Sequence, residues 1–143
     1  SIYEAEHEYA KAAARYRQVV DVEPNHVFAL NNLAYTLAER QGAPAEGLTF
    51  AERAYRLSPG EPGILDTLGG THHLLGAHDK ALPLLVEAAR LAPKNTDILL
   101  HAAIASAVAK RFDDARRYLA GALAIAPALA STEKVVSLRR QLP

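Results

Sequence analysis

The chain has 143 residues, half of them apolar, and its 16 basic and 16 acidic residues leave no net charge. This balance argues against nucleic acid or an anionic membrane as the partner, and no apolar run approaches the roughly 18 residues of a membrane span, so we expect no direct membrane insertion. The absence of cysteine excludes disulfides, zinc sites built on thiolates and thiol catalysis.

Residues 1–25 carry a helical apolar pattern that stops at Pro24. Residues 1–8 are too few for more than the end of a helix, while residues 9–22 place Ala12, Tyr16 and Val19 on one face of a second helix. We therefore expect a partial repeat over 1–25, with most of its first helix missing.

Residues 26–60 contain two helices, and the first has two distinct faces. Leu30, Leu33 and Leu37 share one helical face, which we expect to be buried. The turn over 41–44 has one residue more than the corresponding turn of the next unit.

Residues 61–95 form the most regular unit. The apolar period predicts helices over 64–75 and about 80–91, separated by a turn over 76–79 and closed by Pro93. The small residues Gly69, Ala81 and Ala88 stand where the two helix backbones must come close. We expect one antiparallel helix pair.

Residues 96–129 repeat this pattern, except that Lys110 replaces the glycine that ends the first helix of the preceding unit. Residues 130–143 predict a final helix with Val135, Val136 and Leu138 on its apolar side. Because the last unit of a stacked array would otherwise expose its stacking face, we expect this helix to be a cap.

A fixed period joins these units, since the prolines that end them, at 24, 59, 93 and 127, are 35, 34 and 34 residues apart. The third unit shows a regular set of small and apolar residues: Leu65, Leu68, Gly69, Gly76, Ala81, Leu85, Ala88 and Pro93. This set resembles the signature of the tetratricopeptide repeat, and phrases such as Asn-Asn-Leu-Ala-Tyr are similar to those of bacterial members from the cytoplasm or the periplasm.

The resemblance implies an all-α, right-handed superhelical solenoid of antiparallel helix pairs. We expect a single array of about three and a half repeats plus a C-terminal capping helix, divided as 1–25, 26–60, 61–95, 96–129 and 130–143. The family's function implies a non-catalytic scaffold for protein partners, with no cofactor.

In such arrays the first helices line the concave side. Here their non-core faces carry amides, aromatic rings, carboxylates and imidazoles that could bind an extended peptide or a partner helix. The plain alternative is an ordinary solvated face. The residues predicted to form the groove are Phe28, Asn31, Asn32, Tyr35, Glu39, Asp66, Thr67, His73, Asp97, His101 and Ile104.

Three other interpretations stay open. Some members of the family grip a partner's terminal carboxylate with basic residues, but Gly63 and Thr67 stand where those residues would be. Self-association through the open ends of the array would make the chain a homo-oligomer. A metal site or an acid–base pair made of His72, His73 and His101 with Asp66 and Asp97 would make it an enzyme, although His72 follows the core face and a buried, hydrogen-bonded imidazole is the simpler interpretation.

Overall fold

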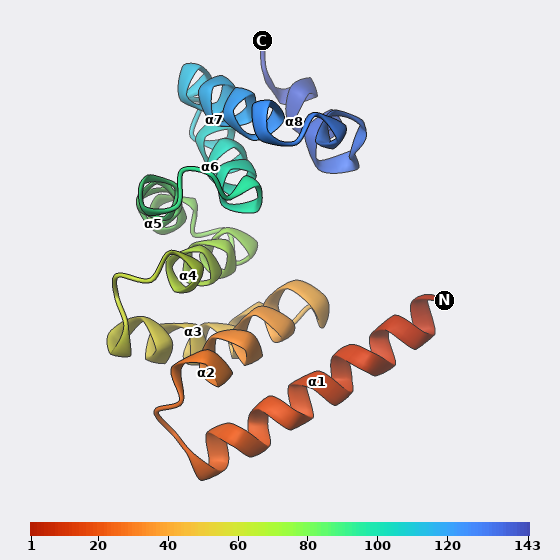
Figure 1. Cartoon of the computed structure of the whole chain (residues 1–143), viewed down its shortest axis with the longest axis vertical. Coiled ribbons are helices and arrows are strands. Elements are labelled where there is room, and N and C mark those ends of the chain that lie inside the picture. Colours follow the sequence, from red (N-terminus) through yellow and green to blue (C-terminus); the bar gives the residue numbers. More distant parts are fainter.

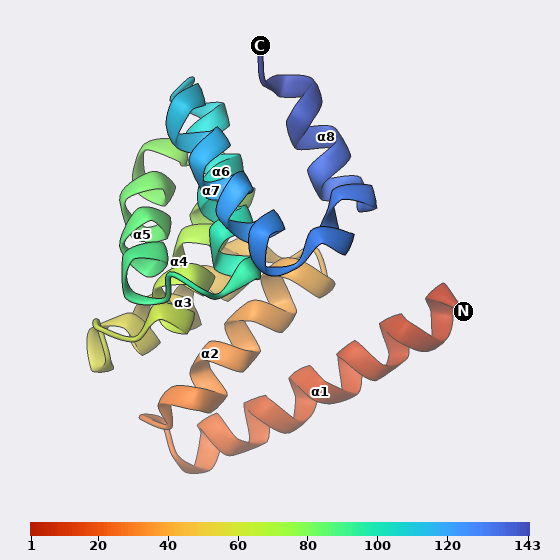
Figure 2. The same ribbon diagram turned by 45° about the horizontal axis from the view of Figure 1, so that its top comes forward.

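The computed structural model describes all 143 residues, and every regular element in it is helical. Consecutive helices, joined by short turns, run back against one another and stack into an elongated array (Figures 1 and 2). None of them combines the length and apolar composition that crossing a bilayer requires. The elements are α1 (Ile2–Val22), α2 (Val27–Tyr35) continued by the π-helix η1 (Thr36–Arg40), α3 (Pro44–Leu57), α4 (Pro62–Leu74), α5 (His78–Leu91), α6 (Thr96–Val108), α7 (Phe112–Ile125), the 3-10 helix η2 (Pro127–Ser131) and α8 (Glu133–Gln141).

Helix α1 is continuous over 21 residues, so the expected break between a helix end at 1–8 and a second helix at 9–22 is wrong. No glycine or proline interrupts this stretch, and a capping box between Ser1 and Glu4 satisfies the backbone N–H groups at its start. Only Ala13 and Val20 of this helix are buried. Residues 2–8 are all exposed.

The core is divided into clusters along the stack instead of surrounding one centre. One cluster joins α1, α2 and α3 around Leu30 and Leu33, and a larger one joins the helices from α4 to α8 around Leu99 and Leu119. Such a series of neighbouring contacts is typical of a solenoid. Within the α4–α5 pair, a Cβ atom placed on Gly69 would lie 2.8 Å from Cγ of Leu85, so the glycine allows the two helices to approach.

The first helix of each complete pair ends in the same left-handed conformation. Gly42, Gly76 and Lys110 have φ of 63°, 78° and 60°. Glycine adopts this conformation without strain, whereas Lys110 adopts it at a cost of about 1–2 kcal/mol. The lysine thus keeps the turn geometry that glycine provides in the other two pairs.

The extra residue of the second unit lies inside its first helix and not in the turn, which corrects the prediction. At the end of that helix the N–H of Ala43 donates to the carbonyl of Leu37, six residues back, whereas Ala77 and Arg111 donate to carbonyls five residues back in the other pairs. The helix absorbs the residue by widening into η1, where Gln41 N–H donates to the Thr36 carbonyl at 3.0 Å. Such π-helical insertions are often found at functional sites.

Helix α8 lies at the end of the row of first helices. Helix α2 contacts α4, α4 contacts α6, and α6 contacts α8. Val135 and Leu138 are buried against this end of the core, but Val136 is 38% exposed and does not belong to the apolar face predicted for it. The segment before α8 is a separate 3-10 helix, so the helical cap is shorter than the predicted 130–143.

We predict that Gly69→Leu destabilises the protein by about 1–3 kcal/mol or more, because the new side chain must displace Leu85 from the α4–α5 interface. Thermal unfolding followed by circular dichroism measures the effect. Gly121→Ala is the matched control, since its Cβ would meet Leu99 at an ordinary 3.7 Å and alanine favours the helix by up to about 1 kcal/mol. Equal melting temperatures for wild type and Gly69→Leu would contradict the close approach.

Leu138→Ala should lower the free energy of unfolding by about 2–5 kcal/mol, because it leaves a cavity beneath the buried side of α8. Val136→Ala, on the exposed side of the same helix, should change stability by less than about 0.5 kcal/mol. Denaturant titration of both variants tests the orientation of α8, which would be wrong if the two costs were similar.

Candidate functional site

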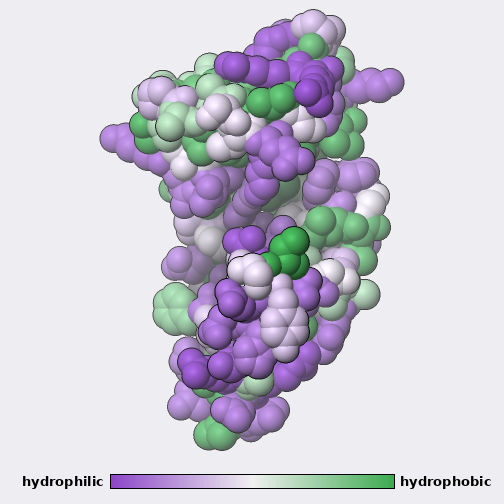
Figure 3. Space-filling view, turned by 90° about the vertical axis from the view of Figure 1, so that its right-hand side faces the viewer, coloured by the Kyte–Doolittle hydropathy of each residue, from purple (hydrophilic) through white to green (hydrophobic).

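One face of α4 lines the side of the helix stack that is on the right in Figure 1. Gly63, Asp66, Gly70 and His73 succeed one another on this face at intervals of three or four residues. Two surface hollows, defined below, lie along it, and we call the face with its hollows the groove face. Figure 3, which looks at this side, shows a mostly hydrophilic surface with small groups of hydrophobic residues.

The central hollow has a volume of about 200 Å³ and is lined mainly by apolar surface. It is assembled from five elements, because η1, α4, α5, α6 and α8 all contribute side chains. Four residues of the predicted groove, Glu39, His73, His101 and Ile104, are therefore brought together with a lysine of the capping helix. The lining residues are Glu39, Gly70, His73, Leu74, Leu85, His101, Ile104 and Lys134.

A second hollow of about 290 Å³, the N-terminal hollow, lies between the starts of α2 and α4. Phe28 stands on its rim and is 74% exposed. Asn31 also lines it, and the side-chain oxygen of this residue is buried without a hydrogen-bond partner. An unpaired buried acceptor costs about 1–3 kcal/mol, so a ligand donor that reached it would recover that energy.

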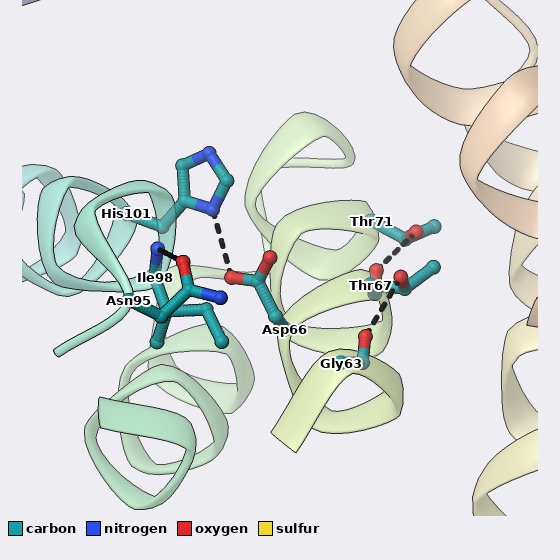
Figure 4. A network of polar contacts seen from close by, with 7 residues as sticks. All are labelled: Gly63, Asp66, Thr67, Thr71, Asn95, Ile98 and His101. Atoms are coloured by element: carbon teal, nitrogen blue, oxygen red, sulfur yellow. Dashed lines mark hydrogen bonds and ion pairs between the residues drawn. The ribbon is translucent and has the colours of Figure 1, made fainter. Parts of the chain in front are cut away.

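Asp66 and His101 connect α4 to α6 on the groove face. Figure 4 shows the two side chains pointing toward each other, with 2.7 Å between Oδ1 of Asp66 and Nδ1 of His101. Since a carboxylate only accepts, Nδ1 carries the proton and donates it. Burial lowers the pKa of His101, but the hydrogen bond and charge of Asp66 outweigh burial and hold that pKa above its usual range.

Tyr35 takes part in an aromatic–cation arrangement with a residue that the sequence analysis missed. The guanidinium of Arg40 lies 5.3 Å from the ring centre of Tyr9 and 5.5 Å from that of Tyr35, and its Nη2 donates to the Tyr35 hydroxyl at 3.1 Å. The stacked arginine holds the Tyr35 ring in place. A cation five residues after a tyrosine would not meet it on a regular helix; the π-helical turn brings the two together.

Glu39 fills the space beside Gly70 on the groove face. Its Oε1 lies 3.2 Å from the position of a Cβ on Gly70, so that space is filled, while the surroundings of Gly63 are open. Neither Glu39 nor Lys134 forms an ion pair, although both line the central hollow. The hollow therefore has an unpaired anion and an unpaired cation at its rim.

Thr67 does not belong to the groove face, which corrects its prediction. It is buried, points to the opposite side of α4 from Asp66, and donates its hydroxyl hydrogen to the Gly63 carbonyl at 3.0 Å (Figure 4). Asn32 and Asp97 are exposed. His72 was expected to be buried and hydrogen-bonded, but its imidazole is partly exposed and forms no hydrogen bond. Burial and then the charge of Lys80 lower its pKa.

The histidines do not gather as the metal or acid–base interpretation supposed. His101 is paired with Asp66, and no group of three or more His, Asp or Glu side chains is arranged around a common point. Instead His73 lies next to His78, a residue that the sequence analysis did not single out, with 3.2 Å between their Nδ1 atoms. Burial, His78 and His101 lower the pKa of His73.

We predict that Asp66→Asn lowers the pKa of His101, measured by following its ring protons in an NMR pH titration. Because the folded pKa is raised, the pair stabilises the fold fully below the unfolded value of about 6.5, and this stabilisation is lost as pH rises through the folded pKa. The melting-temperature difference between wild type and Asp66→Asn should thus be larger at pH 6 than at pH 8.5. Asp97→Asn, an exposed control, should leave the His101 titration unchanged; an equal effect would contradict the pairing.

Known bacterial proteins are similar to this chain in sequence and in structure. A 73-residue segment is 34% identical to the TPR repeat-containing protein PA4667 of Pseudomonas aeruginosa, and it spans 51% of this chain but only 12% of that protein. A structure of MamA AMB-1 superposes with a TM-score of 0.77 at 25% identity over 98% of this chain and 83% of the other. The structure of TTC0263, a thermophilic TPR protein of Thermus thermophilus, superposes with a TM-score of 0.80 at 22% identity. The match covers 96% of this chain and 76% of the other, and it shows the fold alone.

Family models described as tetratricopeptide repeat match residues 2–62 and 72–142. These matches, the observed helix pairs and the similar structures confirm the predicted all-α solenoid. Proteins of this kind are generally non-catalytic scaffolds for protein–protein interaction. The chain belongs to the tetratricopeptide repeat family.

Proposed function

We propose that the groove face binds an extended segment or a helix of a protein partner. The observation that carries the proposal is the pair of hollows along one face of α4, because each is bounded by side chains from neighbouring units. A ligand lying along α4 would touch both. Its contact would extend across three successive first helices and reach Lys134 of α8.

The chemistry of the two hollows supports a ligand with both apolar side chains and accessible backbone. The N-terminal hollow presents the exposed Phe28 ring beside the unpaired Asn31 oxygen. The central hollow has Leu74, Leu85 and Ile104 in its lining. Apolar anchors in such hollows supply area, and an amide that bonds the peptide backbone supplies register.

The charges on the groove face favour neither a strongly acidic nor a strongly basic ligand. Glu39 and Asp66 offset Lys134 and the His101 imidazole, and Asp97 adds one exposed carboxylate. The free terminal carboxylate of a ligand has no cluster of basic side chains to meet. We therefore expect recognition of an internal segment of the partner, and amidation of a bound peptide's C-terminus should leave its affinity unchanged.

Self-association is the second candidate, and the exposed apolar residues of α1 favour it. Ile2, Tyr3 and Val22 are 80%, 77% and 81% exposed. A second copy that covered α1 would bury these side chains. Sedimentation velocity over a range of concentrations separates this candidate from groove binding, since Ile2→Ser with Tyr3→Ser would weaken self-association without touching the groove face.

Groove binding predicts that Tyr35→Ala and Asn32→Ala each reduce the binding free energy of a partner peptide by about 1–3 kcal/mol, the cost typical of hot-spot positions. The partner is first captured from the source organism and mapped to a peptide, whose affinity is then measured by calorimetry. Val86→Ala, which removes an apolar side chain 37% exposed on α5, is the matched control and should bind like wild type. Unchanged affinity in both groove variants would place the interface elsewhere.

A further inference from the structure

The turn between α4 and α5 holds two imidazoles face to edge. His73 is the penultimate residue of α4 and His78 is the first residue of α5. Their Nδ1 atoms are 3.2 Å apart, and the ring planes meet at 61° with 4.9 Å between ring centres. At this distance either one ring donates its Nδ1–H to Nδ1 of the other, or both Nδ1 lone pairs point to a bound metal ion.

We propose that His73 and His78 form a binding site for a zinc ion, with Nδ1 of each imidazole as a ligand. Zinc–imidazole bonds of about 2.0–2.1 Å in tetrahedral geometry place two ligand nitrogens about 3.3 Å apart. The Nδ1 atoms are already at nearly this separation.

The backbone of the turn holds the two residues in this relation before any ion binds. The N–H of Gly76 donates to the His73 carbonyl at 3.0 Å, and the N–H of Ala77 donates to the His72 carbonyl at 2.9 Å. Gly76 supplies the left-handed conformation, with φ of 78°. A two-ligand site gains from such preorganisation, because little chain entropy is lost when the metal is bound.

The surroundings suit a zinc ion. Zinc binds imidazole in its neutral form, which is the common form of the side chain near pH 7 and above. His78 is exposed, so water can complete the tetrahedron, since no third protein ligand is in place. Imidazole ligands favour zinc over magnesium and calcium, which prefer oxygen.

This inference is independent of peptide binding, although His73 also lines the central hollow. A zinc ion bound by His73 and His78 would keep two coordination positions for exchangeable ligands.

Titration of the untagged protein with zinc chloride in a calorimeter tests the site. We expect one zinc ion per chain and at least about tenfold weaker binding in His73→Ala and in His78→Ala. His7→Ala, which removes an exposed imidazole from α1, and His72→Ala, which removes the neighbour of His73, should bind zinc like wild type. Magnesium and calcium chloride should give no saturable binding.

A second measurement identifies the ligand atoms. Long-range proton–nitrogen NMR spectra of the imidazoles should show the Nδ1 resonances of His73 and His78 shifting with zinc, while their Nε2 atoms keep the proton. Thermal melts in the absence of metal check that the alanine variants are folded. Zinc affinity unchanged in both variants, or equal loss of affinity in His7→Ala, would overturn the proposal and leave a shared proton between the two rings.

Discussion

The close approach of helix backbones at small residues is the constraint on which the rest of the structure depends. A Cβ on Gly69 would lie within 2.9 Å of two Leu85 atoms, and one on Gly47 would lie 2.9 Å from the Ala34 carbonyl oxygen. Ala81 and Ala88 are completely buried on the other side of the α4–α5 interface. Because each pair is held at this distance, successive pairs can stack at a regular spacing and present their first helices to one side.

The groove face follows from this regular stacking together with one local departure from it. Stacking alone would give a row of first helices with equivalent faces. The residue inserted in the second unit widens the end of α2 into η1, and this places Glu39 over Gly70 and brings Arg40 onto the Tyr35 ring. A single extra residue, absorbed in a helix, thus contributes the wall of one hollow and the support of its neighbouring aromatic residue.

Electrostatic contacts on the groove face link units instead of stabilising single helices. Asp66 and His101 are 35 residues apart in sequence, and their partly buried contact joins α4 to α6 on the groove face. In contrast, the ion pairs at Glu87–Arg90, Asp113–Arg116 and Asp114–Arg117 lie within single helices and are exposed, so each adds little to stability. The Asp66–His101 pair differs from these because it is partly buried and joins two successive units.

The sequence by itself determined the helix pairs, their period and the family, because these depend on local properties. Apolar spacing, prolines after each second helix and small residues at fixed intervals act within a turn or two of the chain. The helical period also assigns one face of each first helix to the core and another to solvent, and Asn32 and Tyr35 are exposed as this assignment predicts.

Only the tertiary structure decided which of these residues meet. The sequence shows that the second unit has one extra residue, but only the structure shows that this residue widens the end of α2 into η1 and does not lengthen the turn. Thr67 lies next to Asp66 in sequence, but the two side chains point to opposite sides of α4, and Thr67 is buried while Asp66 is partly exposed. The contact of His73 with His78 depends on the turn that reverses the chain between them. Distances across a turn or between units are set by packing, which the helical period alone does not encode.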